Sequence, residues 1–178
     1  MAPPARRRFL TLLASSTLAL AVRPAQAALA ASSRELRLAH LHTGEALTVE
    51  YVQAGRYQAD ALAAVNHLLR DFRTGDVHTI DPVLLDVLYA VRGRVASRRP
   101  FEVISGYRSP HTNAALRRAS GGVAAGSLHM TGRAIDIRLR DVPLVALRRS
   151  GVAVAAGGVG YYPASNFVHL DTGRVRAW

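Results

Sequence analysis

Two histidines and one aspartate in the second half of the chain have side chains of the kind that bind zinc. His129 and Asp136 lie seven residues apart, with the small residues Gly132 and Ala134 between them, and His169 follows in the segment F-V-H-L-D. Two His and one Asp can hold a tetrahedral zinc ion with one position left open. The chain has no cysteine, so any metal must be held by His, Asp or Glu. These residue types therefore predict an open zinc site.

Two predicted strands would bring these ligands together. Residues 133–139 alternate between aliphatic and small or polar side chains, which predicts a strand with Asp136 on the face opposite the aliphatic core. Gly132 allows the chain to bend before this strand, so that His129 can fold back beside Asp136. His169 completes the site if its own strand lies nearby.

Of the remaining histidines, His40 and His42 are candidate ligands by residue type alone. His40 and His42 flank the turn of a predicted hairpin, where histidines are expected to be solvated. His67 is expected on a helix surface, and His111 follows Pro110 at an exposed position. We expect none of the four to bind the metal.

Arg108 is the one cation whose sequence position points to the same site. It follows the predicted strand 101–105 in the run S-G-Y-R-S. A guanidinium is permanently charged and carries a planar fork of donors. At the mouth of a metal site it could hold a substrate carboxylate or the oxyanion of a tetrahedral intermediate.

The remaining segments predict helices and strands that support this site. Apolar periodicity and turn residues predict a hairpin over 36–52, helices over 60–73, 82–97, 112–119 and 141–149, and a glycine-rich strand over 157–163. Asp81 and Asp141 are expected as N-caps. A mixed α+β domain follows, in which the helices pack against a sheet.

Residues 1–27 have the layout of a signal peptide. Arg6–Arg8 precede an apolar run over 9–22, and Ala25–Ala27 form a small-x-small cleavage site. The pattern R-R-x-F-L resembles the twin-arginine (Tat) signal, which directs folded proteins to the Tat export machinery. An ordinary Sec signal or an uncleaved anchor is the alternative. We therefore expect export to the periplasm and one domain over 28–178.

All 23 basic residues are arginine, and the formal net charge is +11. Loss of the predicted signal would lower this charge to +7. A GC-rich genome or a preference for anionic partners explains the bias. We expect no nucleic-acid binding, because no recognition helix and no basic stripe interleaved with aromatic residues is present. An anionic cell-wall polymer remains compatible with this charge. Oligomeric state is left open.

The motifs together resemble those of the zinc D-alanyl-D-alanine peptidases and murein endopeptidases, which share their fold with hedgehog signalling domains. The motif S-x-H-x-x-G-x-A-x-D is complete, from Ser127 to Asp136, and a later H-x-D is present as His169 and Asp171. The segments S-G-Y-R-S-P, G-G-V-G-Y-Y-P and F-V-H-x-D-T-G are similar to those of an exported bacterial subgroup, the YcbK-type murein endopeptidases. The likeness covers about residues 34–178.

This resemblance implies an α+β fold in which a small antiparallel sheet, flanked by helices, carries the metal site. It implies zinc held by His129, Asp136 and His169, with Arg108 binding substrate and the transition state and Ser127 near the substrate. The implied activity is a zinc metallopeptidase, a peptidoglycan hydrolase that cuts peptide cross-links with metal-activated water. Its partners would be the peptide stems of peptidoglycan.

One departure from the family concerns the general base. Many relatives carry an acidic residue three positions before the last zinc histidine, or a histidine two positions before it. Here these positions hold Asn166 and Phe167, and neither side chain accepts a proton at neutral pH. Asp171 is either a substitute catalytic base or a carboxylate that orients a zinc histidine.

Three functions remain open on this reading. The first is a peptidoglycan endopeptidase or DD-carboxypeptidase, with the bond left open among D-alanyl–diaminopimelate, an L,D linkage and a terminal D-alanine. The second is a wall-binding module that keeps the metal but has little or no activity. The third is a zinc peptidase or amidase for another substrate.

Overall fold

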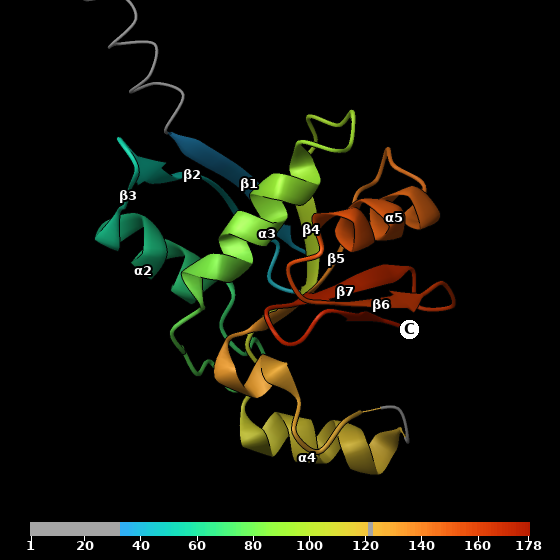
Figure 1. Ribbon diagram of the computed structural model, residues 1–178. Coiled ribbons are helices and arrows are strands. Elements are labelled where there is room, and N and C mark those ends of the chain that lie inside the picture. The colour runs from blue at the N-terminus through green and yellow to red at the C-terminus, as the bar shows by residue number, and fades with distance from the viewer. Residues whose placement is uncertain (1–32, 121–122) are drawn as a thin grey trace, which may run out of the picture.

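A mixed eight-stranded sheet forms the centre of the part of the molecule that the computed structural model describes, residues 33–120 and 123–178 (Figure 1). The predicted signal peptide lies outside the described residues. The sheet order is β3-β2-β1-β4-β5-β7-β6-β8. Its strands are β1 (Arg34–His40), β2 (Ala46–Gln53), β3 (Arg56–Tyr57), β4 (Phe101–Ser105), β5 (Ala134–Arg138), β6 (Gly158–Tyr162), β7 (Phe167–Asp171) and β8 (Arg176–Ala177).

The strands pair antiparallel except at two places. β1 runs parallel to β4, and β6 runs parallel to β8. The predicted hairpin is the β1–β2 pair. The α+β prediction is confirmed, and the sheet also extends on both sides of the antiparallel β4-β5-β7-β6 centre that carries the expected ligands.

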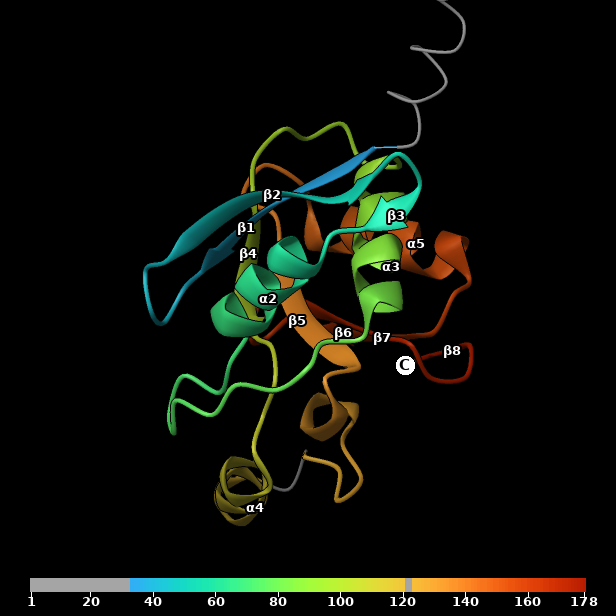
Figure 2. The same cartoon turned by 90° about the vertical axis from the view of Figure 1, so that its left-hand side faces the viewer.

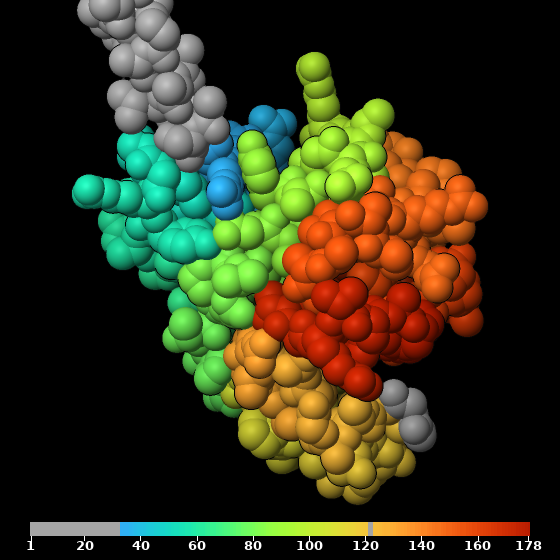
Figure 3. All heavy atoms as spheres, viewed as in Figure 1, coloured from blue at the N-terminus to red at the C-terminus, as the bar shows by residue number. Residues whose placement is uncertain are grey.

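Three helices pack against the sheet and one lies apart from it. These are α2 (Ala59–Leu68), α3 (Pro82–Arg92) and α5 (Leu144–Val154), and the separate one is α4 (Pro110–Ala119). The short 3-10 helix η1 (Leu128–Thr131) lies with α4 beyond one end of β4 and β5, as two views at right angles agree (Figure 2). The space-filling view shows the η1 segment and the C-terminal strands meeting in one continuous surface (Figure 3).

The hydrophobic core lies between the sheet and helices α3 and α5. Leu84, Leu88 and Leu147 are fully buried, as are Ile135 and Ile137 from β5. Alternation along each strand then turns the intervening side chains to the opposite face. That second face carries the candidate metal ligands.

The helix predicted over 60–73 ends at Leu68, five residues earlier than expected. The residues after it serve another segment. The carbonyl of Leu69 accepts a hydrogen bond from the Tyr107 amide, and the Asp71 carboxylate accepts one from the Ser109 amide. A continued helix would withdraw both acceptors from the loop that carries Arg108.

The two N-cap predictions have different outcomes. Asp81 caps α3, because its side chain accepts a hydrogen bond from the Val83 amide. The prediction for Asp141 is wrong: α5 begins at Leu144 with Pro143 as its N-cap. The Asp141 carboxylate instead accepts a hydrogen bond from Ser97 Oγ.

The lengths and hydropathy of the helices bear on whether any could cross a lipid bilayer. None of those in the described ranges is both long enough and apolar enough to span a membrane.

Candidate metal centre

One cross-strand row of residues carries the centre of the site. Ser105 of β4 pairs with Asp136 of β5, Asp136 pairs with His169 of β7, and His169 pairs with Gly160 of β6. Directly opposed residues on one sheet face have Cβ atoms about 4.5–5.5 Å apart. The register therefore brings together two of the three expected ligands, although they lie 33 positions apart in the sequence.

The third ligand, His129, enters from η1. Ser127 caps this short helix by accepting a hydrogen bond from the His129 amide. Gly132 then adopts a left-handed conformation, with φ of 66°. A Cβ atom at Gly132 would lie 2.1 Å from the carbonyl oxygen of Thr79. Only glycine allows this bend, and the bend places His129 over the β5 strand.

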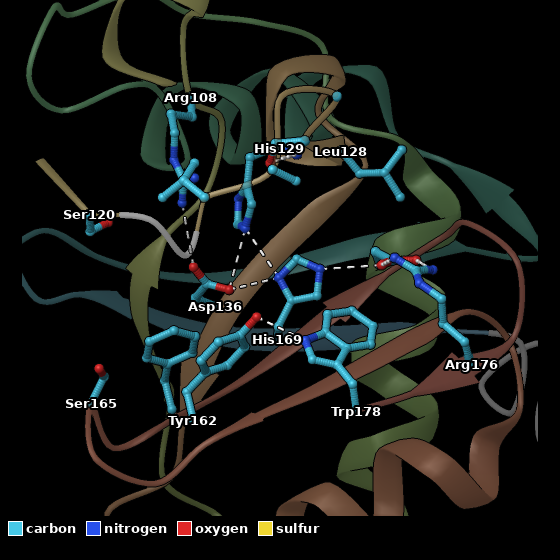
Figure 4. Close-up of a pocket in the computed structure, with 16 residues that line it drawn as sticks. Arg108, Ser120, Leu128, His129, Asp136, Tyr162, Ser165, His169, Arg176 and Trp178 are labelled. Carbon is cyan, nitrogen blue, oxygen red and sulfur yellow. Dashed lines mark hydrogen bonds and ion pairs between the residues drawn. The ribbon is translucent and has the colours of Figure 1, made fainter. Parts of the chain in front are cut away.

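The three ligand atoms form a compact triangle (Figure 4). His129 Nε2 lies 3.2 Å from His169 Nδ1 and 3.3 Å from Asp136 Oδ1, and His169 Nδ1 lies 2.8 Å from Asp136 Oδ1. Ligands about 2.0–2.1 Å from a tetrahedral zinc ion are separated by about 3.3 Å. The residues present therefore fit a zinc ion that is held by three ligands and has a fourth position open.

Each histidine has a second contact that sets its tautomer. Nδ1 of His129 lies 2.7 Å from the carbonyl oxygen of Gly106, which requires a proton on Nδ1 and leaves Nε2 free to bind a metal. Nε2 of His169 lies 3.2 Å from Asp171 Oδ2, which favours a proton on Nε2 and leaves Nδ1 free. A carboxylate or carbonyl behind each metal histidine is the usual arrangement at zinc sites.

Asp171 is fully buried and its carboxylate is saturated with donors. Besides His169, Oδ2 accepts a hydrogen bond from Arg176 Nη2 at 2.7 Å. Oδ1 accepts from the amides of Gly158 and Gly173 at 2.9 and 2.8 Å, and from Arg176 Nη1 at 3.2 Å. Burial acts to raise the pKa of Asp171, but the bonds from His169, Arg176 and the two amides hold it below its ordinary value.

The electrostatics of the triangle favour a positive charge at its centre. Burial acts to raise the pKa of Asp136, but the imidazoles of His129 and His169 outweigh it and the pKa lies below its ordinary range. Burial acts to lower the pKa of His169, but the carboxylates of Asp136 and Asp171 raise it to about 9. A cation between these groups is therefore stabilised by a carboxylate that stays ionised.

Arg108 reaches the site from the loop after β4. Its Nη2 lies 3.7 Å from Asp136 Oδ2 and 3.4 Å from Ser105 Oγ, and its Nη1 lies 3.5 Å from the side-chain oxygen of Asn113. Its backbone amide donates to the carbonyl of His129 at 3.1 Å. These side-chain contacts are long, so the guanidinium keeps donor capacity for a bound group.

A pocket of about 370 Å³ opens over the three ligands. Arg108 lies on one side of it, and Tyr162 and Trp178 lie on the other (Figure 4). Ser127 and Phe167 also line the pocket. The structure thus brings all six predicted site residues to one place: Arg108, Ser127, His129, Asp136, His169 and Asp171.

The four histidines that were not expected to bind the metal lie elsewhere. His67 and His111 are exposed, as expected. His40 is only 1% exposed, so the expectation that it is solvated is wrong: its ring packs edge-on against Phe72, on which His42 also stacks. None of the four belongs to the metal-binding group found in the described residues.

Sequence reasoning missed several residues that shape the site. Tyr162 and Trp178 form part of the pocket wall, Arg176 holds Asp171, and Asp71 holds the loop after Arg108. The two glycines of G-V-G-Y-Y were the one available signal, since glycine in a strand often marks a close approach by another group. Arg176 and Asp71 carried no signal among many similar residues.

Comparison with known proteins gives a family. The family model Peptidase_M15_2, described as "Peptidoglycan L,D-endopeptidase MepK", matches residues 28–178. The chain is 43% identical over 177 residues to the "Peptidoglycan L,D-endopeptidase MepK" of Escherichia coli K12, covering 98% of this chain and 97% of the relative. It is 41% identical over 170 residues to the "Probable peptidoglycan L,D-endopeptidase MepK" of Haemophilus influenzae, covering 95% and 88%. The resemblance drawn from the motifs is confirmed.

Proposed function

Because this chain belongs to the Peptidase_M15_2 family, we propose that it is a zinc-dependent peptidoglycan hydrolase that cleaves peptide cross-links at an L,D bond. The endopeptidase activity and the bond type come from the names of its relatives. The sequence left the bond open among three linkages, and these names favour the L,D linkage.

One observation supports this function above the others. His129 Nε2, Asp136 Oδ1 and His169 Nδ1 lie 2.8–3.3 Å from one another at the floor of an open pocket. Nitrogen and carboxylate ligands in this geometry suit zinc, and three protein ligands leave the position that a catalytic zinc requires. The same ligand set favours zinc over calcium or magnesium, which prefer more oxygen ligands.

The chain's own residues supply positioning and charge. When bound, zinc would polarise the scissile carbonyl and lower the pKa of a water molecule to about 7. Arg108 offers free donors beside the site and would bind the developing oxyanion or a stem-peptide carboxylate. Ser127 holds η1, and therefore His129, in place and also faces the pocket.

For Asp171, the contacts favour orientation over proton transfer. Five donors already fill its two oxygens, and its side chain has no exposed surface. A general base must reach the proton that it removes, and this carboxylate has no free lone pair directed into the pocket. We assign Asp171 the role of fixing the His169 tautomer.

Export places the enzyme with its substrate. Residues 1–27 have the twin-arginine signal layout, and peptidoglycan lies outside the cytoplasmic membrane. We therefore propose delivery through the Tat machinery, cleavage after Ala27 and a periplasmic domain over residues 28–178. Retention of the segment as an anchor is the alternative that N-terminal sequencing of the exported protein would detect.

The test is digestion of purified sacculi followed by mass analysis of the released products. Zinc-loaded protein is expected to release peptides cut at the L,D cross-link, while chelator-treated protein and a His129→Ala variant release none. Products cut only at D-alanyl bonds would overturn the bond assignment. If zinc-loaded protein binds sacculi but releases no product, the wall-binding alternative is favoured. That alternative is based on Asn166 and Phe167, which occupy the two expected base positions and cannot accept a proton.

A further inference from the structure

Two aromatic residues join by a hydrogen bond beside the metal ligands. Trp178 Nε1 donates to the Tyr162 hydroxyl oxygen at 2.9 Å. The Trp178 ring lies 5.5 Å from the His169 ring, measured between centroids. Neither residue belongs to the motifs that define the metal site, yet both line the pocket above it.

Gly160 makes room for this pair. It lies next to His169 in the cross-strand row, and its missing side chain leaves space on the ligand-bearing face. A Cβ atom at Gly160 would lie 2.8 Å from an atom of each ring, Trp178 and Tyr162. β8 runs parallel to β6, and the Trp178 amide donates to the Val159 carbonyl, so the sheet itself positions the indole.

The Tyr162 hydroxyl is oriented by its neighbours. Its ring stacks on Phe167 with centroids 4.6 Å apart. Its oxygen already accepts the indole N–H, so the hydroxyl proton is left for donation to another acceptor. Figure 4 shows the hydroxyl end of Tyr162 directed toward Asp136 and His169, across the pocket from Arg108.

We propose that Tyr162 is a substrate-binding donor of this site and that Trp178 is its positioning residue. The Tyr162 hydroxyl donates a hydrogen bond to the peptide carbonyl under attack, from the side opposite Arg108, and strengthens it as negative charge develops on that oxygen. No proton is transferred, because the phenol stays neutral throughout. The inference rests on the proposed peptidase function.

The pair also accounts for the departure at Phe167. In many relatives this position or the preceding one holds the base, whereas here the Phe167 ring supports Tyr162. The pocket therefore relies on stabilising charge on the substrate oxygen from two sides.

The test compares Tyr162→Phe and Trp178→Phe with the control Tyr161→Phe, which makes the same change one residue away on the other sheet face. On a cross-linked muropeptide, Tyr162→Phe is expected to lower kcat by about 10²–10³-fold, the range for loss of one neutral oxyanion donor. Trp178→Phe is expected to lower kcat by about 3–10-fold, because the donor remains but loses its orientation. Tyr161→Phe is expected to match the wild type, and zinc affinity is expected to be unchanged in all three.

A second readout does not depend on activity. Trp178 is the sole tryptophan of the sequence, so intrinsic fluorescence reports on this residue alone. Tyr162→Phe removes the acceptor of the indole N–H and is expected to shift the emission spectrum, whereas Tyr161→Phe is not. Muropeptide binding to chelator-treated protein is expected to change the same emission, with a dissociation constant about 3–10-fold higher in Tyr162→Phe than in the wild type.

The outcomes separate the two proposals. If zinc-loaded wild-type protein cuts no muropeptide, the proposed function fails, whatever the fluorescence shows. If the wild type cuts and Tyr162→Phe keeps its kcat, KM and binding constant, the role of Tyr162 is overturned. A Tyr162→Phe variant that loses zinc affinity would also overturn it, because the residue would then act on the metal site and not on substrate. An unchanged Trp178→Phe would remove the positioning role.

Discussion

Replacement of Asp171 by asparagine distinguishes between two roles for this residue, orientation of His169 and action as the catalytic base. Three donors converge on Oδ1, namely the Gly158 and Gly173 amides and Arg176 Nη1. The asparagine carbonyl oxygen is therefore expected to occupy the Oδ1 position. Its amide nitrogen would then stand at Oδ2, where it faces His169 Nε2 at about 3.2 Å.

The exchange reverses the hydrogen bond to the histidine. An amide nitrogen donates, so His169 Nε2 must accept and the ring proton moves to Nδ1. Nδ1 is the atom that faces Asp136 Oδ1 at 2.8 Å and would bind zinc. Metal binding must then expel that proton and break the new bond. Loss of such a supporting partner lowers metal affinity by about 10–100-fold, or about 1.4–2.7 kcal/mol.

The assay is zinc competition against a chromophoric chelator, together with kcat measured at saturating zinc. Asp171→Asn is expected to bind zinc about 10–100-fold more weakly and to keep kcat within about tenfold of the wild type once the site is full. Asp141→Asn makes the same chemical change at a surface carboxylate that contacts Ser97, and is expected to behave as the wild type. Unchanged zinc affinity with a kcat loss of about 10²–10⁴ at saturating zinc would instead identify Asp171 as the base.

Three further outcomes follow from the same contacts. His129→Ala is expected to abolish stoichiometric zinc binding, while His40→Ala keeps about one zinc per chain, both read by metal analysis after dialysis. Arg108→Lys is expected to lower kcat/KM on muropeptides by about 10²–10³-fold with zinc affinity little changed, because a lysine lacks the planar donor fork. Glu102 is buried, which acts to raise its pKa, but its bonds to Arg138 and Arg140 lower the pKa overall. Ionised Glu102 therefore stabilises the fold at pH values above its pKa in the unfolded chain, and this contribution is lost as pH falls through its pKa in the folded protein. Glu102→Gln is expected to lower the free energy of unfolding by about 1 kcal/mol at pH 7 and by less at pH 3, as measured by urea unfolding.

Part of the candidate ligand set could be predicted because local sequence features determine how His129 and Asp136 are placed. A His-bearing turn, a glycine with positive φ and an alternating strand together predict that His129 and Asp136 meet. The register between β5 and β7 was not predictable, since pairing depends on side chains throughout the sheet. The residue types therefore offered His169 only on the condition that its strand lies near β5, and the pairing of Asp136 with His169 meets that condition.

The end of helix α2 and the position of Trp178 were not predicted because both depend on contacts between segments that lie far apart in the sequence. Helix α2 ends early because Leu69 and Asp71 bond to the loop near Arg108, a contact between segments far apart in the sequence. Propensity alone favours continuation of the helix, and tertiary hydrogen bonds override it. Trp178 was missed for the same reason, since its place beside His169 depends on the parallel pairing of β8 with β6.

The remaining chemical question is which group accepts the proton of the attacking water. The pocket wall in the described part of the chain contains two carboxylates, Asp136 and Asp171. Asp136 would hold the metal through Oδ1, and five donors already bond to the Asp171 carboxylate. Of the two family base positions, Phe167 lines the pocket and Asn166 does not. A positioned base contributes about 10²–10⁴-fold. Without one, catalysis would depend on the metal site and on the donors that stabilise the substrate oxygen, which by our proposals are Arg108 and Tyr162.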